Sequence, residues 1–303
     1  MSKLSPTLKV LISAPHARPN TLPAPPAVRS VYERLRQEAV AQNVGLPAWL
    51  TLSTATTMTM NSPDGLTELY NIATSSSRDK EQSVLAAELM REVGLKCIGF
   101  NGVRIPTRQL THALGWTEEA DHVTVMTGAF RANLPREIAS SLSTTPTRHT
   151  TPSTLPSILA RGASLWTSIY RPFDSKLFAK LAQSHPDLPS FIVDHEYGAL
   201  FADPSVQYVP GAKVGRVLTS IVAIAGLRAQ TGVGPQVTSH VYGLRKAYED
   251  GSAGAQGEAV VQGGEWLAGD EGCVWLLGGV DKIVEALSGG AGTSFAPGFK
   301  AKL

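Results

Sequence analysis

One histidine lies where the sequence pattern makes chemistry most plausible. His240 comes just after Pro235, and Val237, Val241 and Leu244 share its face of a helical pattern. This spacing turns the imidazole towards the interior. A buried polar group without a partner costs roughly 1–3 kcal/mol there, so the ring needs a partner or a task. It could carry a proton or bind a carboxylate, or it could be a core histidine bonded to a main-chain carbonyl.

Other polar residues could act with this histidine. Gln236 and Ser239 flank it and could orient a substrate oxygen, or they could only cap the first turn of the helix. His195 and Glu196 could form a second proton carrier at the same pocket, or they could lie on a solvated helix face. Arg228 ends the preceding helix, where it could hold a substrate carboxylate by a two-pronged bond or complement the helix C-terminus.

The first half of the chain contains a second group of candidates. Glu88 and Glu92 lie one helical turn apart, either at a shared pocket or at the surface. Cys97 ends the same helical stripe and is either a small buried hydrophobe or a redox thiol. The chain has 2 cysteines in all, so no zinc spacing exists and at most one disulfide can form. We therefore expect a reducing intracellular setting, no metal site and no cofactor.

The elements that must position these residues are predicted to be helices. The expected helices cover residues 28–43, 46–60, 66–73, 78–96, 106–115, 118–140, 166–181, 190–201 and 266–287, the last interrupted at Gly278–Gly279. Residues 215–248 are predicted to form two helices joined by a tight Gly-rich turn, and the other elements are organised around this pair. No run alternates with the period of a strand, so we expect an all-α fold. A similar order of elements around 63–104 and 186–245 also suggests an internal duplication.

Composition limits the class of protein. The chain has 303 residues, of which 43% are hydrophobic and 17% charged, as in a globular protein. Its net charge of +2 is too weak and dispersed to favour a nucleic-acid or membrane partner. No run approaches the ~20 apolar residues of a membrane span.

The two ends are predicted to be flexible, and the carboxyl end resembles an address. Ala301, Lys302 and Leu303 have the small-basic-leucine form of the peroxisomal signal, one residue away from Ser-Lys-Leu. Glycines and a proline in residues 289–300 should keep this tail accessible to an import receptor. The expected location is the peroxisomal matrix.

Four separated runs resemble a known family. The sequence HPDL begins at His185 and DHEYGALFADP at Asp194, and RVLTSIVAI begins at Arg216 and QVTSH at Gln236. In this order they look like the core of the carboxymuconolactone decarboxylase family, which shares the AhpD-like helical fold. The likeness covers about 65 residues, with a fainter echo around 80–115. Together with the tail, it is most similar to a fungal-type peroxisomal branch.

This resemblance implies how the chain is divided into domains and how it assembles into an oligomer. Residues 28–140 would be an N-terminal AhpD-like half, and residues 159–288 a carboxymuconolactone decarboxylase-like half. A flexible leader (1–27) would precede them, a Ser/Thr/Pro-rich linker or excursion (141–158) would join them, and a tail (289–303) would follow. The family assembles through its helices, so the resemblance implies a homodimer.

The resemblance also implies a chemistry. The family's decarboxylases remove CO₂ from a lactone acid without a metal or an organic cofactor. Its pattern places a glutamate and a histidine four residues apart; this chain has Gln236 and His240 there, and glutamine cannot titrate. The AhpD branch uses Cys-x-x-Cys-x-x-x-His as a thiol peroxidase. Here Phe100 takes the position of the second cysteine and Arg104 that of the histidine, so Cys97 cannot form the intramolecular disulfide that the peroxidase cycle needs.

Three functions follow as expectations. The first is a cofactor-free lyase that acts on a small carboxylated lactone or keto acid. In it His240 carries the proton, Gln236 and Ser239 orient the substrate, and Arg228 holds an anionic group. The second is a thiol-dependent peroxidase that uses Cys97. The third is a binding or scaffold protein that kept the fold and lost the chemistry.

Overall fold

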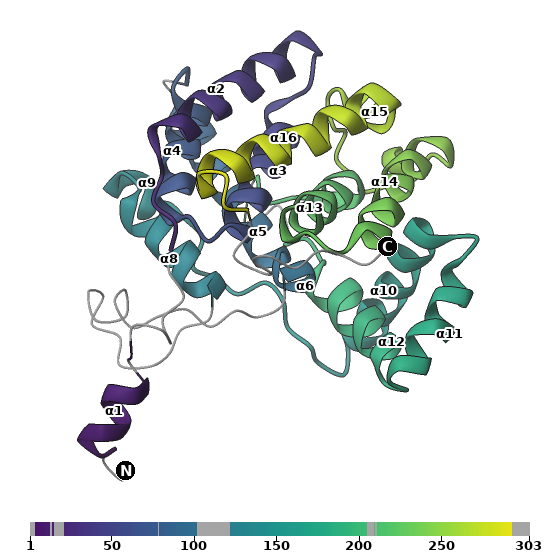
Figure 1. Cartoon of the computed structure of the whole chain (residues 1–303). Coiled ribbons are helices and arrows are strands. Elements are labelled where there is room, and N and C mark those ends of the chain that lie inside the picture. Colours follow the sequence, from purple (N-terminus) through teal and green to yellow (C-terminus); the bar gives the residue numbers. More distant parts are fainter. Residues whose placement is uncertain are drawn as a thin grey trace.

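The architecture is helical throughout the part of the chain that is described. The computed structural model describes residues 4–12, 14, 21–77, 79–101, 122–204, 209 and 211–292. Within these ranges there are helices and no strand, so the all-α prediction is confirmed (Figure 1). The helix expected at 106–115, Arg104 and the C-terminal tripeptide lie outside the described residues.

Two helices form the centre of the core. α3 (Leu46–Thr59) is buried from Ala48 to its end and contains no charged residue. It packs along α13 (Gly215–Gln230), and Figure 1 shows the two near the middle of the molecule. Three threonines of α3 donate hydroxyl hydrogen bonds to the carbonyl four residues earlier, at 2.7–2.8 Å. These local bonds satisfy three of the buried hydroxyls of α3, whereas those of Thr51, Ser53 and Thr54 have no hydrogen-bond partner among the described residues.

Helices from both ends of the chain surround this centre. They are α2 (Pro26–Ala41), α4 (Pro63–Thr74), α5 (Lys80–Lys96) and α16 (Asp270–Ser288). α16 packs on α2, α3 and α13, and the largest cluster of buried apolar side chains runs from Val28 to Leu287. The two predicted halves therefore share one core, while the proposed boundaries stay a prediction. Other helices are α1 (Pro6–Ile12), α6 (Ile98–Asn101), α8 (His122–Asn133), α9 (Arg136–Ala139), η3 (Ser252–Gly254) and α15 (Gly264–Ala268).

A smaller group of helices packs at one side of the core (Figure 1). It consists of α10 (Leu155–Tyr170), α11 (Asp174–Ser184), α12 (Leu188–Phe191) and the π-helix η2 (Ile192–Leu200). A second apolar cluster around Trp166 and Tyr197 holds this group together. The group meets the core along α14 (Gly234–Glu249), the helix that follows α13 in the predicted pair.

Two predicted helices have different bounds. The single helix expected at 166–181 is wrong, because α10 ends at Tyr170 and Pro172 precedes a separate helix, α11. A proline disfavours helical backbone at the residue before it and lacks the N–H that would continue the ladder. In the last helical region the interruption falls at Gly269, and α16 runs unbroken through Gly278 and Gly279.

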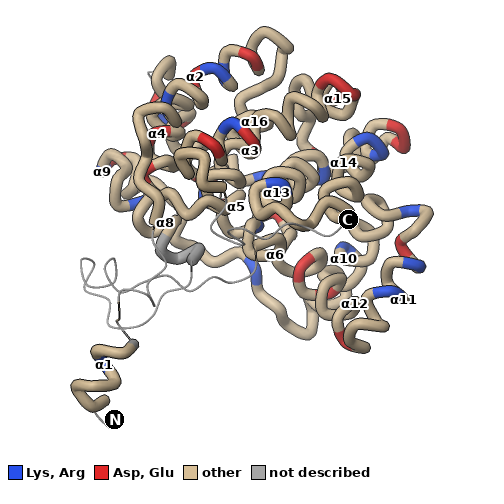
Figure 2. The backbone as a smooth tube through the Cα atoms, in the orientation of Figure 1, with Lys and Arg blue, Asp and Glu red and all other residues tan. Residues whose placement is uncertain are grey.

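Charged residues of both signs are scattered over the molecule, without one strongly charged side (Figure 2). This distribution agrees with the weak net charge of +2. Among the described helices, none combines the length and the apolar character needed to cross a membrane.

α10 and η2 approach each other closely enough to require glycine. A Cβ built on Gly162 would lie 2.2 Å from the carbonyl oxygen of Val193, and one on Gly198 would lie 2.8 Å from that of Ile158. Both obstacles are backbone atoms, which cannot rotate away. The contact therefore fixes how η2 lies against α10.

We predict that Gly162→Ala lowers the free energy of unfolding by about 1–3 kcal/mol or more, because the added methyl must push the two helices apart. Gly278→Ala is the matched control. A Cβ there meets nothing within 4 Å, so replacing this helical glycine should stabilise by roughly 0.5–1 kcal/mol. Urea unfolding followed by circular dichroism measures both. Equal stability of the two variants would contradict the backbone contact.

Candidate functional site

A cavity of about 410 Å³ lies between the small helical group and the core. α10, α11 and η2 form one side, and α6, α13 and α14 form the other. Its apolar wall includes Phe100, Trp166, Leu177, Leu181, Ile192 and Leu227. Its polar groups include His240, Glu196, Lys180, Gln236 and Ser239. The cavity thus brings together four residues that the sequence singled out: His240, Glu196, Gln236 and Ser239.

His240 points inward, as predicted, and its side chain is 2% exposed. Its Nε2 lies 3.2 Å from the hydroxyl of Tyr170, and its Nδ1 is buried with no hydrogen-bond partner among the described residues. Its ring and that of Phe100 meet nearly at right angles, with 5.5 Å between the ring centroids. Burial, with the nearby Arg216 cation, lowers the pKa of His240 from 6.5 to about 3. The imidazole is therefore neutral near pH 7.

Two tyrosines extend this contact into a chain of hydrogen bonds. The Tyr170 hydroxyl lies 2.8 Å from the Tyr197 hydroxyl, so Tyr197, Tyr170 and His240 follow one another. Burial raises the pKa of Tyr170 to about 12 and that of Tyr197 well above its ordinary value. Both phenols keep their hydrogens, and the chain consists of neutral donors and acceptors.

Glu196 supplies the acid of the cavity. It lies half-buried on η2, and its carboxyl group makes no hydrogen bond or ion pair with the described residues. Burial alone raises the pKa of Glu196 from 4.5 to about 7. A carboxyl group with this pKa can give or take a proton near neutral pH. Its position on a π-helix is notable because such turns are rare and frequently lie at functional sites.

Arg216 lies behind the histidine and ties three helices together. Its guanidinium donates to Ser168 Oγ on α10 at 2.6 Å and to the carbonyl of Gly243 on α14 at 2.7 Å. It also donates to Ser220 Oγ within α13 at 2.7 Å. The side chain is 4% exposed, so its charge acts in a weakly screened environment.

The remaining predicted residues of the second half fall in different places. Gln236 and Ser239 line the cavity, and the Ser239 hydroxyl donates to the carbonyl of Pro235 at 3.0 Å. His195 is exposed, lies against the ring of Phe191 and is not among the lining residues.

Arg228 does not hold an anion in the cavity, which corrects the expectation for this residue. Its guanidinium binds Asp281 of α16 through two bonds of 2.9 and 2.8 Å. The preceding residue, Leu227, is the one that lines the cavity. Successive side chains of a helix point in different directions, so Arg228 faces α16 instead.

Cys97 is 1% exposed at the end of α5, and burial raises the pKa of its thiol to about 12. Thiol chemistry needs the thiolate, which such a group does not form near neutral pH. Cys97 is not among the residues that line the cavity.

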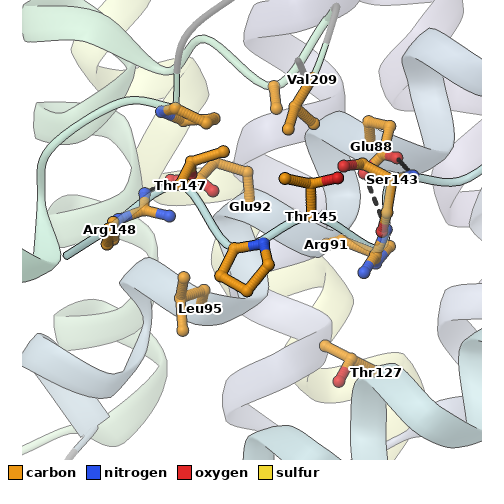
Figure 3. Close-up of a pocket in the computed structure, with 13 residues that line it drawn as sticks. Glu88, Arg91, Glu92, Leu95, Thr127, Ser143, Thr145, Thr147, Arg148 and Val209 are labelled. Carbon is orange, nitrogen blue, oxygen red and sulfur yellow. Dashed lines mark hydrogen bonds and ion pairs between the residues drawn. The ribbon is translucent and has the colours of Figure 1, made fainter.

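Glu88 and Glu92 line a second pocket of about 260 Å³ (Figure 3), and His240 is not among the residues that line it. Both are buried, at 3% and 6% exposure, and the Ser/Thr/Pro-rich stretch crosses over them. Glu88 binds Arg91 at 2.9 Å and the backbone N–H of Ser143 at 2.5 Å, and Arg148 binds Glu92. The stretch predicted to be a linker is thus fastened to α5 by the Arg148–Glu92 ion pair and by the Ser143–Glu88 hydrogen bond.

Sequence patterns missed Tyr170, Lys180, Trp166 and Phe100. Tyr170, Lys180 and Trp166 come from the small helical group, and Phe100 comes from α6, which packs on α13 and α5, so their approach to the cavity depends on tertiary packing. Tyr197 was within reach, because it follows Glu196 in the run DHEYG. A hydroxyl directly after a candidate acid in the sequence is the signal that could have identified Tyr197.

Among the described residues, no three His, Cys, Asp or Glu side chains are grouped so as to hold a metal ion. Comparison with protein-family models, with curated protein sequences and with solved structures finds no match to this chain.

His240 should leave a signature in the pH dependence of stability. Below its unfolded pKa of 6.5 the unfolded chain takes up a proton that the folded chain refuses until about pH 3. Stability must therefore fall as the pH falls through this window. His240→Gln removes this contribution. Between about pH 7.5 and about pH 5 the difference in unfolding free energy between wild type and variant should shift by about 2 kcal/mol in favour of the variant.

Urea unfolding at several pH values measures this shift. Glu196 titrates in both proteins, so its opposite effect, a loss of stability as the pH rises towards 7, cancels in the difference. Parallel curves for the two proteins would contradict a neutral buried imidazole.

Cys97 should resist alkylation. In the native protein at about pH 8, iodoacetamide should leave Cys97 unmodified, because the thiol is buried and protonated. In urea the same thiol should react readily. Mass spectrometry of its peptide reports both states, and rapid native labelling would argue for the peroxidase alternative.

Proposed function

We propose that this chain is a cofactor-free lyase that removes CO₂ from a small keto acid or carboxylated lactone. The observation that carries the proposal is the half-buried, unpartnered Glu196, with a pKa near 7, in the same apolar cavity as the neutral chain of His240, Tyr170 and Tyr197. A proton donor and neutral hydrogen-bond donors in a site partly shielded from water are the groups that such a reaction needs.

The reaction divides these groups into two tasks. The bond between the carboxylate carbon and its neighbour breaks, CO₂ leaves, and the electron pair passes onto an enolate. A hydrogen-bond donor stabilises the enolate oxygen, and the carboxylic acid of Glu196 then gives its proton to the carbon. Solvent reprotonates Glu196, which is only half-buried. Substrate anion and one proton thus become neutral product and CO₂.

The proton carrier is therefore Glu196 rather than His240. An imidazole with a pKa of about 3 holds no transferable extra proton near neutral pH, whereas a carboxyl group with a pKa of about 7 does. His240 instead orients the tyrosines. Gln236 and Ser239 keep the orienting role expected for them, since both line the cavity.

The hydrogen bonds that link His240, Tyr170 and Tyr197 have a preferred direction of donation. If Nε2 of His240 carries the hydrogen and donates to Tyr170, then Tyr170 donates to Tyr197, and the Tyr197 hydrogen is left for the substrate. In this arrangement the unpartnered Nδ1 is an acceptor. The reverse direction would bury an N–H without a partner, and unpaired buried N–H groups are the rarer case.

The proposal includes the family and the cellular setting. The resemblance of the four runs to the carboxymuconolactone decarboxylase family supports an AhpD-like member of its peroxisomal branch, acting as a homodimer. The ending Ala301-Lys302-Leu303 supports import into the peroxisome through the receptor for such tripeptides. The thiol peroxidase alternative is not proposed, because Cys97 is buried and protonated.

The test is CO₂ release from a panel of β-keto acids and carboxylated unsaturated lactones. Glu196→Gln should lower kcat/KM by about 10²–10⁴-fold, because the amide cannot donate the proton. For the wild type, kcat/KM should fall above about pH 7 as the acid form is lost. Asp194→Asn, two residues earlier on η2 and not among the lining residues, is the matched control and should keep full activity.

Two outcomes would contradict the proposal. One is turnover of the panel that is unaffected by Glu196→Gln. The other is a lack of turnover with every member, which would favour the binding or scaffold alternative.

A further inference from the structure

We infer that the cavity takes a monocarboxylic acid with a flat, apolar body, and that Lys180 recognises its single carboxylate. The inference rests on the proposed function for the reaction that follows, but its binding step can be measured alone. It narrows the substrate class from carboxylated lactones and keto acids in general to those with one charge and an aromatic or similarly flat body.

The charge of the cavity admits one anionic group. Lys180 is the only lysine or arginine among the described residues that line it, and it makes no ion pair with them. Arg228, the cation that the sequence led us to expect in this site, is bound by Asp281 on another face. A second carboxylate would have to enter the apolar part beside Glu196 without a counter-charge, which is strongly unfavourable.

The walls suit a flat body. Four aromatic residues line the cavity, namely Phe100, Trp166, Tyr170 and Tyr197. The ring centroids of Trp166 and Tyr170 lie 4.3 Å apart. Leu177 and Leu181 of α11 complete an apolar surface opposite α14. Aromatic rings of this kind prefer offset or edge contacts with another ring. The volume of about 410 Å³ lies within the range of small-molecule sites.

Lys180 belongs to the least buried helix of the site. No residue of α11 is buried, and the helix packs against α10 and α12 at the side of the molecule (Figure 1). The lysine itself is exposed, so its attraction for a carboxylate is screened and modest. It can guide the acid into position without holding the carboxylate too firmly for CO₂ to leave.

The experiment is isothermal titration calorimetry of the full chain with three probes. They are 3-phenylpropionate, its neutral amide 3-phenylpropanamide, and the dicarboxylate adipate. We expect 3-phenylpropionate to bind, and adipate to bind about tenfold more weakly or not at all. Lys180→Met should weaken 3-phenylpropionate about two- to fivefold and leave the amide unchanged.

The same helix offers a matched control. Lys176 is also an exposed lysine of α11 but does not line the cavity, so Lys176→Met should leave all affinities unchanged. Circular dichroism confirms that both variants fold.

Several results would overturn the inference. They are adipate binding as tightly as 3-phenylpropionate, no binding of 3-phenylpropionate at millimolar concentration, and identical effects of the two lysine variants. The proposed function fails separately. If binding follows the expected pattern but the β-keto acid benzoylacetate releases no CO₂ above its spontaneous rate, the lyase proposal is wrong and the ligand class stands. If benzoylacetate is turned over while Lys180→Met changes nothing, the ligand class is wrong and the lyase proposal stands.

Discussion

The candidate site depends on the hydrogen bonds that the guanidinium of Arg216 donates. A buried cation is costly unless oxygen atoms surround it, and here hydroxyls and carbonyls of α10, α13 and α14 do so. These acceptors belong to the same three helices that present Tyr170, Leu227 and His240 to the cavity. The bonds that satisfy the charge therefore also set the distance between the small helical group and the core. The same charge disfavours a second cation on His240, so one residue affects both geometry and protonation.

The result is an inverted order of proton affinities. In water a histidine holds its proton to a higher pH than a glutamate does. In this cavity Glu196 titrates near 7 and His240 near 3, because each loses water and neither gains an opposite charge. At neutral pH the acid holds a proton that it can give, while the imidazole acts only through its neutral nitrogens. Titratable groups whose pKa values are pushed apart in one site are a physical basis for separate acid and orienting roles.

The sequence was enough to predict the fold class and some of the residues that line the candidate site. The α13 and α14 pair, the inward His240 and the cavity positions of Gln236 and Ser239 follow from helical periodicity, which is a local property. Tyr170 and Lys180 could not be predicted in this way. Their positions depend on where α10 ends, on α11 turning back after Pro172, and on the glycine contact that sets η2 against α10. Arg228 shows the opposite error: it has a suitable side chain near the site, but the helix turns it towards α16.

Comparison of Glu92 with Glu196 shows how ion-pair partners oppose the effect of burial on the pKa of a carboxyl group. Glu92 is the more deeply buried, at 6% exposure, and burial raises its pKa, but Lys96 and Arg148 lie against it and oppose that shift. Its charge fastens the 143–148 stretch to α5, which is a structural task. Glu196 is less buried, yet no cation offsets its loss of water, so its proton is held to about pH 7. An arginine beside Glu196 would satisfy its carboxyl group, as Arg148 does for Glu92. The unpaired acid costs stability at neutral pH, and such a cost is most readily understood where the proton itself is used.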